Sequence, residues 1–381
     1  MPRARAESLK RILEMHRTMW DDDKTRSSAR EAFAKVIDCG TAALGAEVFA
    51  SETEERIVYH TCKSRACPSC GHQATRAWQR DQWRELPEIP YAHVTFTMPD
   101  CLWPLFQHNR HLLHDLPVLG AQVLQQWARQ KYGIRLLIVV IPHTFGRKLN
   151  FNSHLHILVS DGGLREDGTQ WYAPARLDRN ALMPMWRYAV ITLLREGLRA
   201  GALQTDMDRD ALLRLLTAQY ERWWNTDIKP FRSKQQFLAY AGRYARRPPI
   251  AQHRFRGAGR QEIRFVTKDT RTKRMVETVY TPADFLAALA DHVPDRYRHN
   301  VRYFGLLAPR AKSQTQDAVF ALLGQKRLGK PGRLGWAASL QKSFGVDPLL
   351  DRNGERMRWE RRLPPRPPSS KPMARSRLSL E

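Results

Sequence analysis

Two tyrosines have the spacing of a nucleophile pair. Tyr240 and Tyr244 stand four residues apart in FLAYAGRYARRPP, a helical stretch that ends at Pro248. Residues at i and i+4 share one helix face, so both phenols can reach one site. A phenolate attacks phosphorus and leaves again easily, and two phenols permit two successive strand transfers. The same spacing also suits two rings that pack in a core.

The basic residues around the tyrosines fit a phosphate ligand. Arg243, Arg246 and Arg247 offer N–H donors, and we expect all three to contact DNA. The whole chain carries a formal net charge of +25. Such a field attracts polyanions, which makes nucleic acid the first candidate partner and an anionic membrane surface the second.

Two histidines form a candidate metal platform. His154 and His156 lie in HLHILVS, which alternates as a β-strand does, so both imidazoles share one face and Leu155 faces the core. A divalent ion held there polarises a phosphate oxygen, and Mg²⁺ or Mn²⁺ suits the site. Two solvent-facing histidines on an edge strand would give the same pattern. The third ligand remains open among His143, Gln236 and Asp161, with His143 preferred.

A cysteine cluster predicts a zinc site. Cys62, Cys67 and Cys70 lie in CKSRACPSCG, where the CxxC turn directs two thiolates at one ion. The fourth ligand is Cys39, His60 or His72, and we favour Cys39 because it comes from a separate segment. Five cysteines are an odd number, which argues against a disulfide framework. Unliganded buried thiols are the alternative.

The elements that position these groups follow from periodicity and breaker residues. We expect the strands that carry the histidines to form a hairpin through residues 142–153. The tail from about residue 325 is rich in Gly, Pro and Arg, and this composition predicts that the tail is poorly ordered. We expect helices over 1–35, 76–86, 102–131, 179–224, 234–244 and 282–292, and strands over 91–98, 134–141 and 154–160, with two more between 252 and 280 and a last short strand or turn at 302–307.

Together these motifs resemble the two-tyrosine HUH transposases of IS91-type insertion sequences. The resemblance runs from about residue 36 to 310 and includes CGTAALG, CKSRACPSCG, HVTFTMP, HTFGRKLNFNSHLHILVSDGGL, YAGRYARRPPIA and VRYFGLLA. It implies that His154 and His156 hold the divalent metal, that Tyr240 and Tyr244 are the nucleophiles, and that the cysteines form a zinc-binding region. The implied reaction nicks single-stranded DNA at element ends and passes a 5′-phosphotyrosine strand to a target. Many relatives carry a further CxxC where residues 47–59 have no cysteine, so we expect one zinc ion.

The expected fold is α+β: an antiparallel HUH nuclease sheet with covering helices on one side and a small zinc-binding module. We assign 1–85 to the N-terminal helix and zinc module, 86–310 to the catalytic domain with a helical insertion near 175–235, and 311–381 to a basic, partly disordered tail. No apolar run approaches the ~20 residues that span a bilayer, and no apolar signal core is visible, so we expect a cytoplasmic, nucleoid-associated bacterial protein.

Two other interpretations remain. A rolling-circle replication initiator or relaxase uses the same chemistry but usually carries helicase or primase segments, and no GxxxxGK[ST] motif is present. A non-catalytic zinc-containing DNA-binding protein would leave both residue pairs without a chemical role. Metal-dependent cleavage of single-stranded DNA separates this second interpretation from the transposase.

Overall fold

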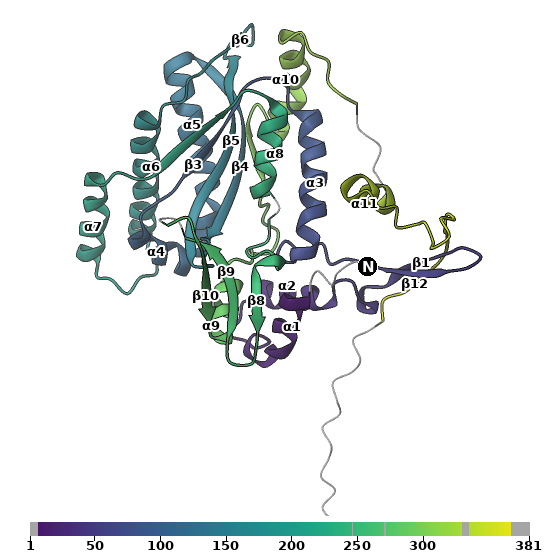
Figure 1. Cartoon of the computed structure of the whole chain (residues 1–381). Helices are drawn as coiled ribbons and strands as arrows, with labels where there is room; N and C mark the ends of the chain where they lie inside the picture. Colours follow the sequence, from purple (N-terminus) through teal and green to yellow (C-terminus); the bar gives the residue numbers. More distant parts are fainter. Residues whose placement is uncertain (1–6, 246, 270–271, 330–334, 367–381) are drawn as a thin grey trace, which may run out of the picture.

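The computed structural model describes residues 7–245, 247–269, 272–329 and 335–366 of the 381-residue chain. Its main sheet is antiparallel, with strand order β11-β4-β5-β3-β7 and with β6 paired to β5 (Figure 1). The strands are β3 (Tyr91–Phe96), β4 (Ile134–Phe145), β5 (Phe151–Arg165), β6 (Trp171–Tyr172), β7 (Thr226–Phe231) and β11 (Arg302–Gly305).

The central hairpin is β4–β5, as the sequence predicts. It runs further than the two expected strands, because residues 142–145 and 151–153 continue the ladder. The register sets His143 opposite His154 and Ile141 opposite His156. The hairpin therefore brings one predicted metal ligand directly beside another.

Helices cover both faces of this sheet, which corrects the expectation of helices on one side (Figure 1). The apolar run from Ile134 to Ile141 is buried on both faces, because alternate residues belong to two different cores. One face packs on α5 (Leu116–Tyr132) and α6 (Arg179–Arg199), and the other on α3 (Pro68–Glu85), α8 (Lys234–Ala245) and α10 (Pro309–Leu322).

Two predicted helical stretches are divided. Residues 102–131 form α4 (Trp103–His108) and α5, with a 3-10 helix between them, and each α-helix has proline in its first turn. The stretch 179–224 forms α6 and α7 (Arg209–Ala218), and the insertion expected to be helical also supplies the edge strand β7.

The N-terminal module shares a hydrophobic core with a distant segment. It contains α1 (Glu7–Met15), α2 (Ser27–Asp38), β1 (Ala46–Ala50) and β2 (Glu55–Tyr59). Leu9, Ile12 and Phe33 pack in one cluster with Phe265 and Phe285. The later segment forms three strands where two were expected, β8 (Phe255–Ala258), β9 (Ile263–Lys268) and β10 (Met275–Tyr280), followed by α9 (Pro282–Asp291). The described residues of α1 and α2 thus share a core with residues 255–293.

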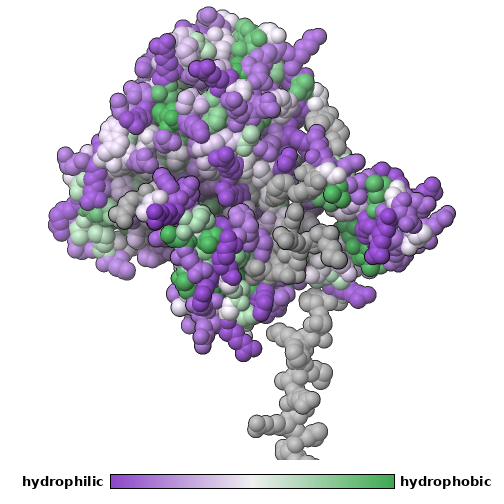
Figure 2. Space-filling view, viewed as in Figure 1, coloured by the Kyte–Doolittle hydropathy of each residue, from purple (hydrophilic) through white to green (hydrophobic). Residues whose placement is uncertain are grey.

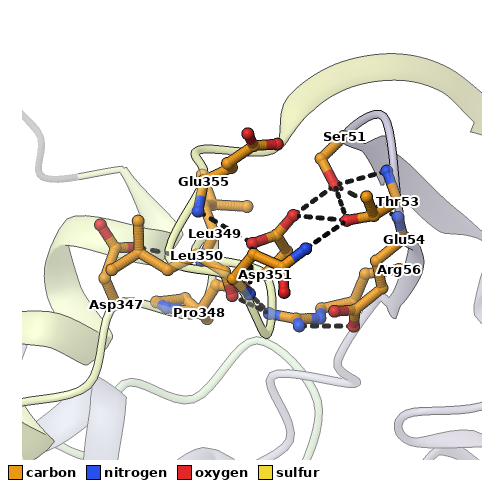
Figure 3. Close-up of polar contacts among 11 residues, drawn as sticks. Ser51, Thr53, Glu54, Arg56, Asp347, Pro348, Leu349, Leu350, Asp351 and Glu355 are labelled. Carbon is orange, nitrogen blue, oxygen red and sulfur yellow. Dashed lines mark hydrogen bonds and ion pairs between the residues drawn. The ribbon is translucent and has the colours of Figure 1, made fainter.

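Much of the expected tail is ordered structure. It contains the end of α10, α11 (Trp336–Phe344) and β12 (Arg358–Leu363), and β12 completes a three-stranded sheet with β1 and β2. Asp351 links the segment before β12 to the turn between β1 and β2. Its carboxylate accepts hydrogen bonds from Ser51 and Thr53 at 2.7 and 2.9 Å (Figure 3). Residues 367–381, also predicted to be poorly ordered, lie outside the described residues.

The face seen in Figure 2 is largely hydrophilic, with apolar residues in small separate groups. No helix in the described ranges combines the length and apolar character needed to cross a membrane.

Candidate active site and metal centres

Three histidines meet on the α8 side of the main sheet. His154 and His156 alternate with Leu155 and Ile157, which pack toward α5 and α6 on the opposite face. His143 joins them across the hairpin from β4. One nitrogen from each of the three imidazoles lies within 4.8 Å of the others, a spacing that can hold a metal ion.

Hydrogen bonds orient the imidazoles. Nδ1 of His154 lies 2.8 Å from the carbonyl of Asn152, and Nε2 of His143 lies 3.0 Å from the carbonyl of Tyr244. A carbonyl only accepts, so these two nitrogens carry the ring protons and the opposite nitrogens keep their lone pairs. Nε2 of His154 lies 3.1 Å from Nε2 of His156, which suits two nitrogens bound to one ion at about 2.1 Å each.

Burial keeps this cluster uncharged. It lowers the pKa of His154, and it lowers the pKa values of His143 and His156 well below the ordinary imidazole value. Neutral imidazole is the form that binds metal. The donor set therefore fits a divalent cation without prior loss of protons near neutral pH.

The other two expected ligands lie in different surroundings. Asp161 accepts a hydrogen bond from the backbone N–H of Arg176. Gln236 is exposed to solvent on α8. Of the three candidates, the structure thus brings His143 to the histidine pair.

The two tyrosines lie directly against the histidines. Their hydroxyls are 3.0 Å apart, with Tyr244 donating to Tyr240. The Tyr244 ring stacks on His156 at 3.8 Å between centroids. Burial and the neighbouring Tyr240 raise the pKa of Tyr244. The i, i+4 spacing thus places both phenols on the side of α8 that faces the histidines.

Cations surround the other tyrosine. The guanidinium of Arg243 lies 4.9 Å from the centroid of the Tyr240 ring, and Nζ of Lys229 lies 4.4 Å from it. Arg243 and Arg247 are exposed and both lower the pKa of Tyr244, although burial outweighs them. Arg246 lies outside the described residues. An anionic phosphate would therefore meet at least three positive charges near the phenols.

Two residues at this site were not identified from sequence. Lys229 comes from β7, a strand the sequence did not reveal. His93 comes from β3, and its Nε2 lies 2.9 Å from Nδ1 of His156. The sequence held a sign of this position. His93 alternates with apolar residues in the predicted strand, so it shares a strand face with Tyr91 and Thr95.

The four predicted cysteines form a second cluster. Cys39 follows α2, Cys62 follows β2, Cys67 directly precedes α3, and Cys70 lies in the first turn of α3. The Sγ of Cys39 is 3.7 Å from those of Cys67 and Cys70, and Cys62 is 3.7 Å from Cys70. Tetrahedral Zn²⁺ with bonds of about 2.3 Å separates its sulfurs by roughly 3.8 Å. The spacing therefore fits one zinc ion and is too long for disulfides.

His60, one alternative fourth ligand, lies elsewhere. Its two ring nitrogens contact the carbonyl of Leu44 and the carboxylate of Glu47 at 3.0 and 3.1 Å. Cys39 is the fourth member of the sulfur cluster, and hydrogen bonds from the Cys62, Cys67 and Cys70 thiols lower the pKa of its own thiol. The side chain of His72 lies outside the described residues.

Comparison with known proteins assigns the family. The model of a transposase zinc-binding domain matches residues 11–98, and that of a putative transposase matches 138–315. The transposase for insertion sequence element IS801 of Pseudomonas savastanoi pv. phaseolicola is 32% identical over 333 residues, 84% of this chain and 80% of that protein. This chain belongs to the IS91-type transposase family. Putative transposase y4qJ of Sinorhizobium fredii (strain NBRC 101917 / NGR234) is 31% identical to this chain over 319 residues, 78% of this chain and 79% of that protein.

The two matched regions of the transposase coincide with the two clusters. All four cysteines fall within the zinc-binding match, and the three histidines and both tyrosines fall within the putative transposase match. Helix α3 leaves the cysteine cluster and packs on α8, with Nε2 of Gln79 donating to the carbonyl of Leu238 at 2.8 Å. The cysteine cluster thereby supports the helix that carries the tyrosines.

Proposed function

We propose that this transposase nicks and rejoins single-stranded DNA through 5′-phosphotyrosine intermediates during rolling-circle transposition. One observation carries the proposal: the hydroxyls of Tyr240 and Tyr244 touch each other beside a cluster of three neutral histidines. Nucleophiles and metal ligands are thus close enough to act on one phosphate.

The covalent step exchanges one phosphoester for another. A phenolic oxygen forms a bond to phosphorus, and the bond from phosphorus to the 3′ oxygen breaks. The phenol loses its proton, and the departing strand gains one as its 3′-hydroxyl. A target 3′-hydroxyl reverses these changes and releases the tyrosine. Because bond energy is kept in the tyrosyl ester, rejoining needs no nucleotide cofactor.

Each group of the site has a defined part in this proposal. Arg243 and Lys229 lie over the ring of Tyr240, where their charges can attract a phosphate, and Arg243 and Arg247 bind the DNA backbone. We assign Arg246 the same backbone contact from its sequence position. His143, His154 and His156 would hold Mg²⁺ or Mn²⁺, which supplies Lewis-acid polarisation of the phosphate. Two tyrosines allow one to hold a cut 5′ end while the other attacks.

The zinc cluster has a structural part. We propose that Cys39, Cys62, Cys67 and Cys70 hold a single Zn²⁺. A closed four-sulfur site leaves no open position for a reacting group, so its contribution is to the fold of the module and to the placement of α3.

The test uses single-stranded oligonucleotides from the flanks of the element, labelled on the 3′ side because the protein captures the 5′ end. We expect a labelled covalent adduct on a denaturing gel with Mn²⁺ and none with EDTA. The adduct should disappear in the Tyr240→Phe/Tyr244→Phe double variant and persist in Tyr188→Phe, which removes an exposed hydroxyl from α6. An annealed duplex of the same sequence tests strand preference.

Binding without an adduct, across several end sequences, would contradict the proposed chemistry. It would leave a zinc-containing DNA-binding protein as the remaining interpretation. An adduct that survives in the double tyrosine variant would show that another residue is the nucleophile.

A further inference from the structure

His93 occupies an unusual position between the metal-binding histidines and the tyrosines. Its side chain is only 2% exposed. Its ring lies nearly parallel to that of Tyr244, 5.0 Å away, and edge-on to that of Tyr240 at 5.2 Å. His93 belongs to neither the group of three metal-binding histidines nor the tyrosine pair. The burial of its polar ring therefore needs another explanation.

The polar contact of His93 is with His156. Nε2 of His93 lies 2.9 Å from Nδ1 of His156, and Nε2 of His156 faces His154 on the other side of the ring. A neutral imidazole carries one proton, and only its bare nitrogen binds metal. If Nε2 of His156 is to hold the ion, its Nδ1 must carry the proton and needs an acceptor.

We propose that His93 is a positioning residue that accepts a hydrogen bond from Nδ1–H of His156 and so directs the Nε2 lone pair of His156 to the metal. The proposal rests on the metal site proposed above. Ligating histidines commonly donate their second N–H to a carboxylate or carbonyl, and that partner fixes tautomer and ring orientation. In this transposase a second histidine supplies the acceptor.

The surroundings of His93 allow this role. Accepting through Nε2 places the single proton of neutral His93 on Nδ1, which is buried and has no hydrogen-bond partner within the described ranges, so metal binding by His156 must offset the cost of that unpaired N–H. A neutral acceptor also places no negative charge beside the position where an anionic phosphate would bind, whereas a carboxylate would.

The experiment measures Mn²⁺ affinity of the full-length transposase by isothermal titration calorimetry, supported by the electron paramagnetic resonance signal of bound Mn²⁺. His93→Phe keeps a flat ring against Tyr244 but removes the acceptor. His93→Gln offers an amide oxygen near the position of Nε2. His16→Phe, which removes another buried imidazole outside this site, is the matched control for general loss of stability.

We expect His93→Phe to weaken Mn²⁺ binding about 10- to 100-fold. His93→Gln should recover much of the affinity, and His16→Phe should leave it unchanged. Should the Phe variant fail to fold, the Gln variant still decides the matter, because retained affinity with an oxygen acceptor supports the role and full loss contradicts it.

Three results would overturn the proposal. Wild-type affinity in His93→Phe would show that no acceptor is needed. Complete loss in both variants, equal to His156→Ala, would make His93 a ligand. Absence of Mn²⁺ binding in the wild type would contradict both the metal site and this proposal. Normal Mn²⁺ binding without a covalent adduct in the oligonucleotide assay would count against the tyrosine chemistry alone.

Discussion

Gly242 lies between the two tyrosines, at the point where α8 packs on α3. A Cβ added there would lie 2.5 Å from Nε2 of Gln79 and 3.1 Å from Cγ2 of Thr75. The same Gln79 nitrogen donates to the Leu238 carbonyl. Gly242→Ala must therefore push the Gln79 side chain aside and break this hydrogen bond.

The expected net effect is a loss of about 0.5 to 3.5 kcal/mol of unfolding free energy. Alanine gains about 1 kcal/mol of helix propensity over glycine. Against this, the lost hydrogen bond costs about 0.5–1.5 kcal/mol and overpacking at Thr75 about 1–3 kcal/mol. Gly197 in α6 is the control, because its added Cβ would meet only Leu203 Cβ at 3.8 Å. Gly197→Ala should stabilise the protein by roughly 0.5–1 kcal/mol.

Denaturant unfolding of both variants measures this difference, and the oligonucleotide adduct assay measures its consequence. A displaced α8 misplaces both phenols, and a 1 Å error in such a site lowers rates about 100-fold. If Gly242→Ala raised stability as much as Gly197→Ala, the contact between α3 and α8 would not be tight. The idea that the cysteine module holds the tyrosine helix would then be wrong.

Three further predictions concern the rest of the fold. Zinc removal by a chelator should speed hydrogen exchange in β8–β10 as well as in α1 and α2, since the cysteines share a core with Phe265; a change confined to residues 36–85 would contradict this. Burial alone would raise the pKa of Glu85, but hydrogen bonds from Lys312 and Gln316 prevail and lower it to about 2. Because the pKa is lowered on folding, ionised Glu85 stabilises the fold above pH 4.5, and this stabilisation is lost as pH falls toward 2. Glu85→Gln should therefore reduce the fall in unfolding free energy between pH 4.5 and 2 by about 1 to 2 kcal/mol after solvent screening. An unchanged pH dependence would refute the role given to Glu85. Asp351→Ala should release β12 from the β1–β2 hairpin and accelerate proteolysis between residues 345 and 363, while unaltered cleavage would show that strand pairing alone suffices.

The parts of this structure that the sequence predicts are those with local signals. The apolar run at Ile134 and the alternation around His154 specify the central hairpin, and the hairpin register then brings His143 to the pair. The CxxC turn specifies two of the four clustered sulfurs. Tyr240 and Tyr244 share a face because helical geometry requires it.

The parts that escaped prediction depend on contacts between distant segments. Strand β12 reads as a charged tail, RWERRL, and becomes a strand only because β1 offers a free edge. The core shared by Leu9 and Phe265 leaves no trace in local periodicity. Lys229 and His93 acquire their roles from side chains on other strands and on α8.

The shared core also has a consequence for how the transposase is made. Arg26 donates to the carbonyl of Ala290, 264 residues further along the chain. At about 5–20 residues per second, the ribosome delivers that partner roughly 10 to 50 s after the N-terminal helices emerge. During this interval α1 and α2 can pack on each other, but their apolar side chains that later join Phe265 and Phe285 in the core stay uncovered. The N-terminal module therefore cannot complete its core until most of the chain has been synthesised. A prematurely terminated copy would leave this apolar surface exposed to aggregation or proteolysis.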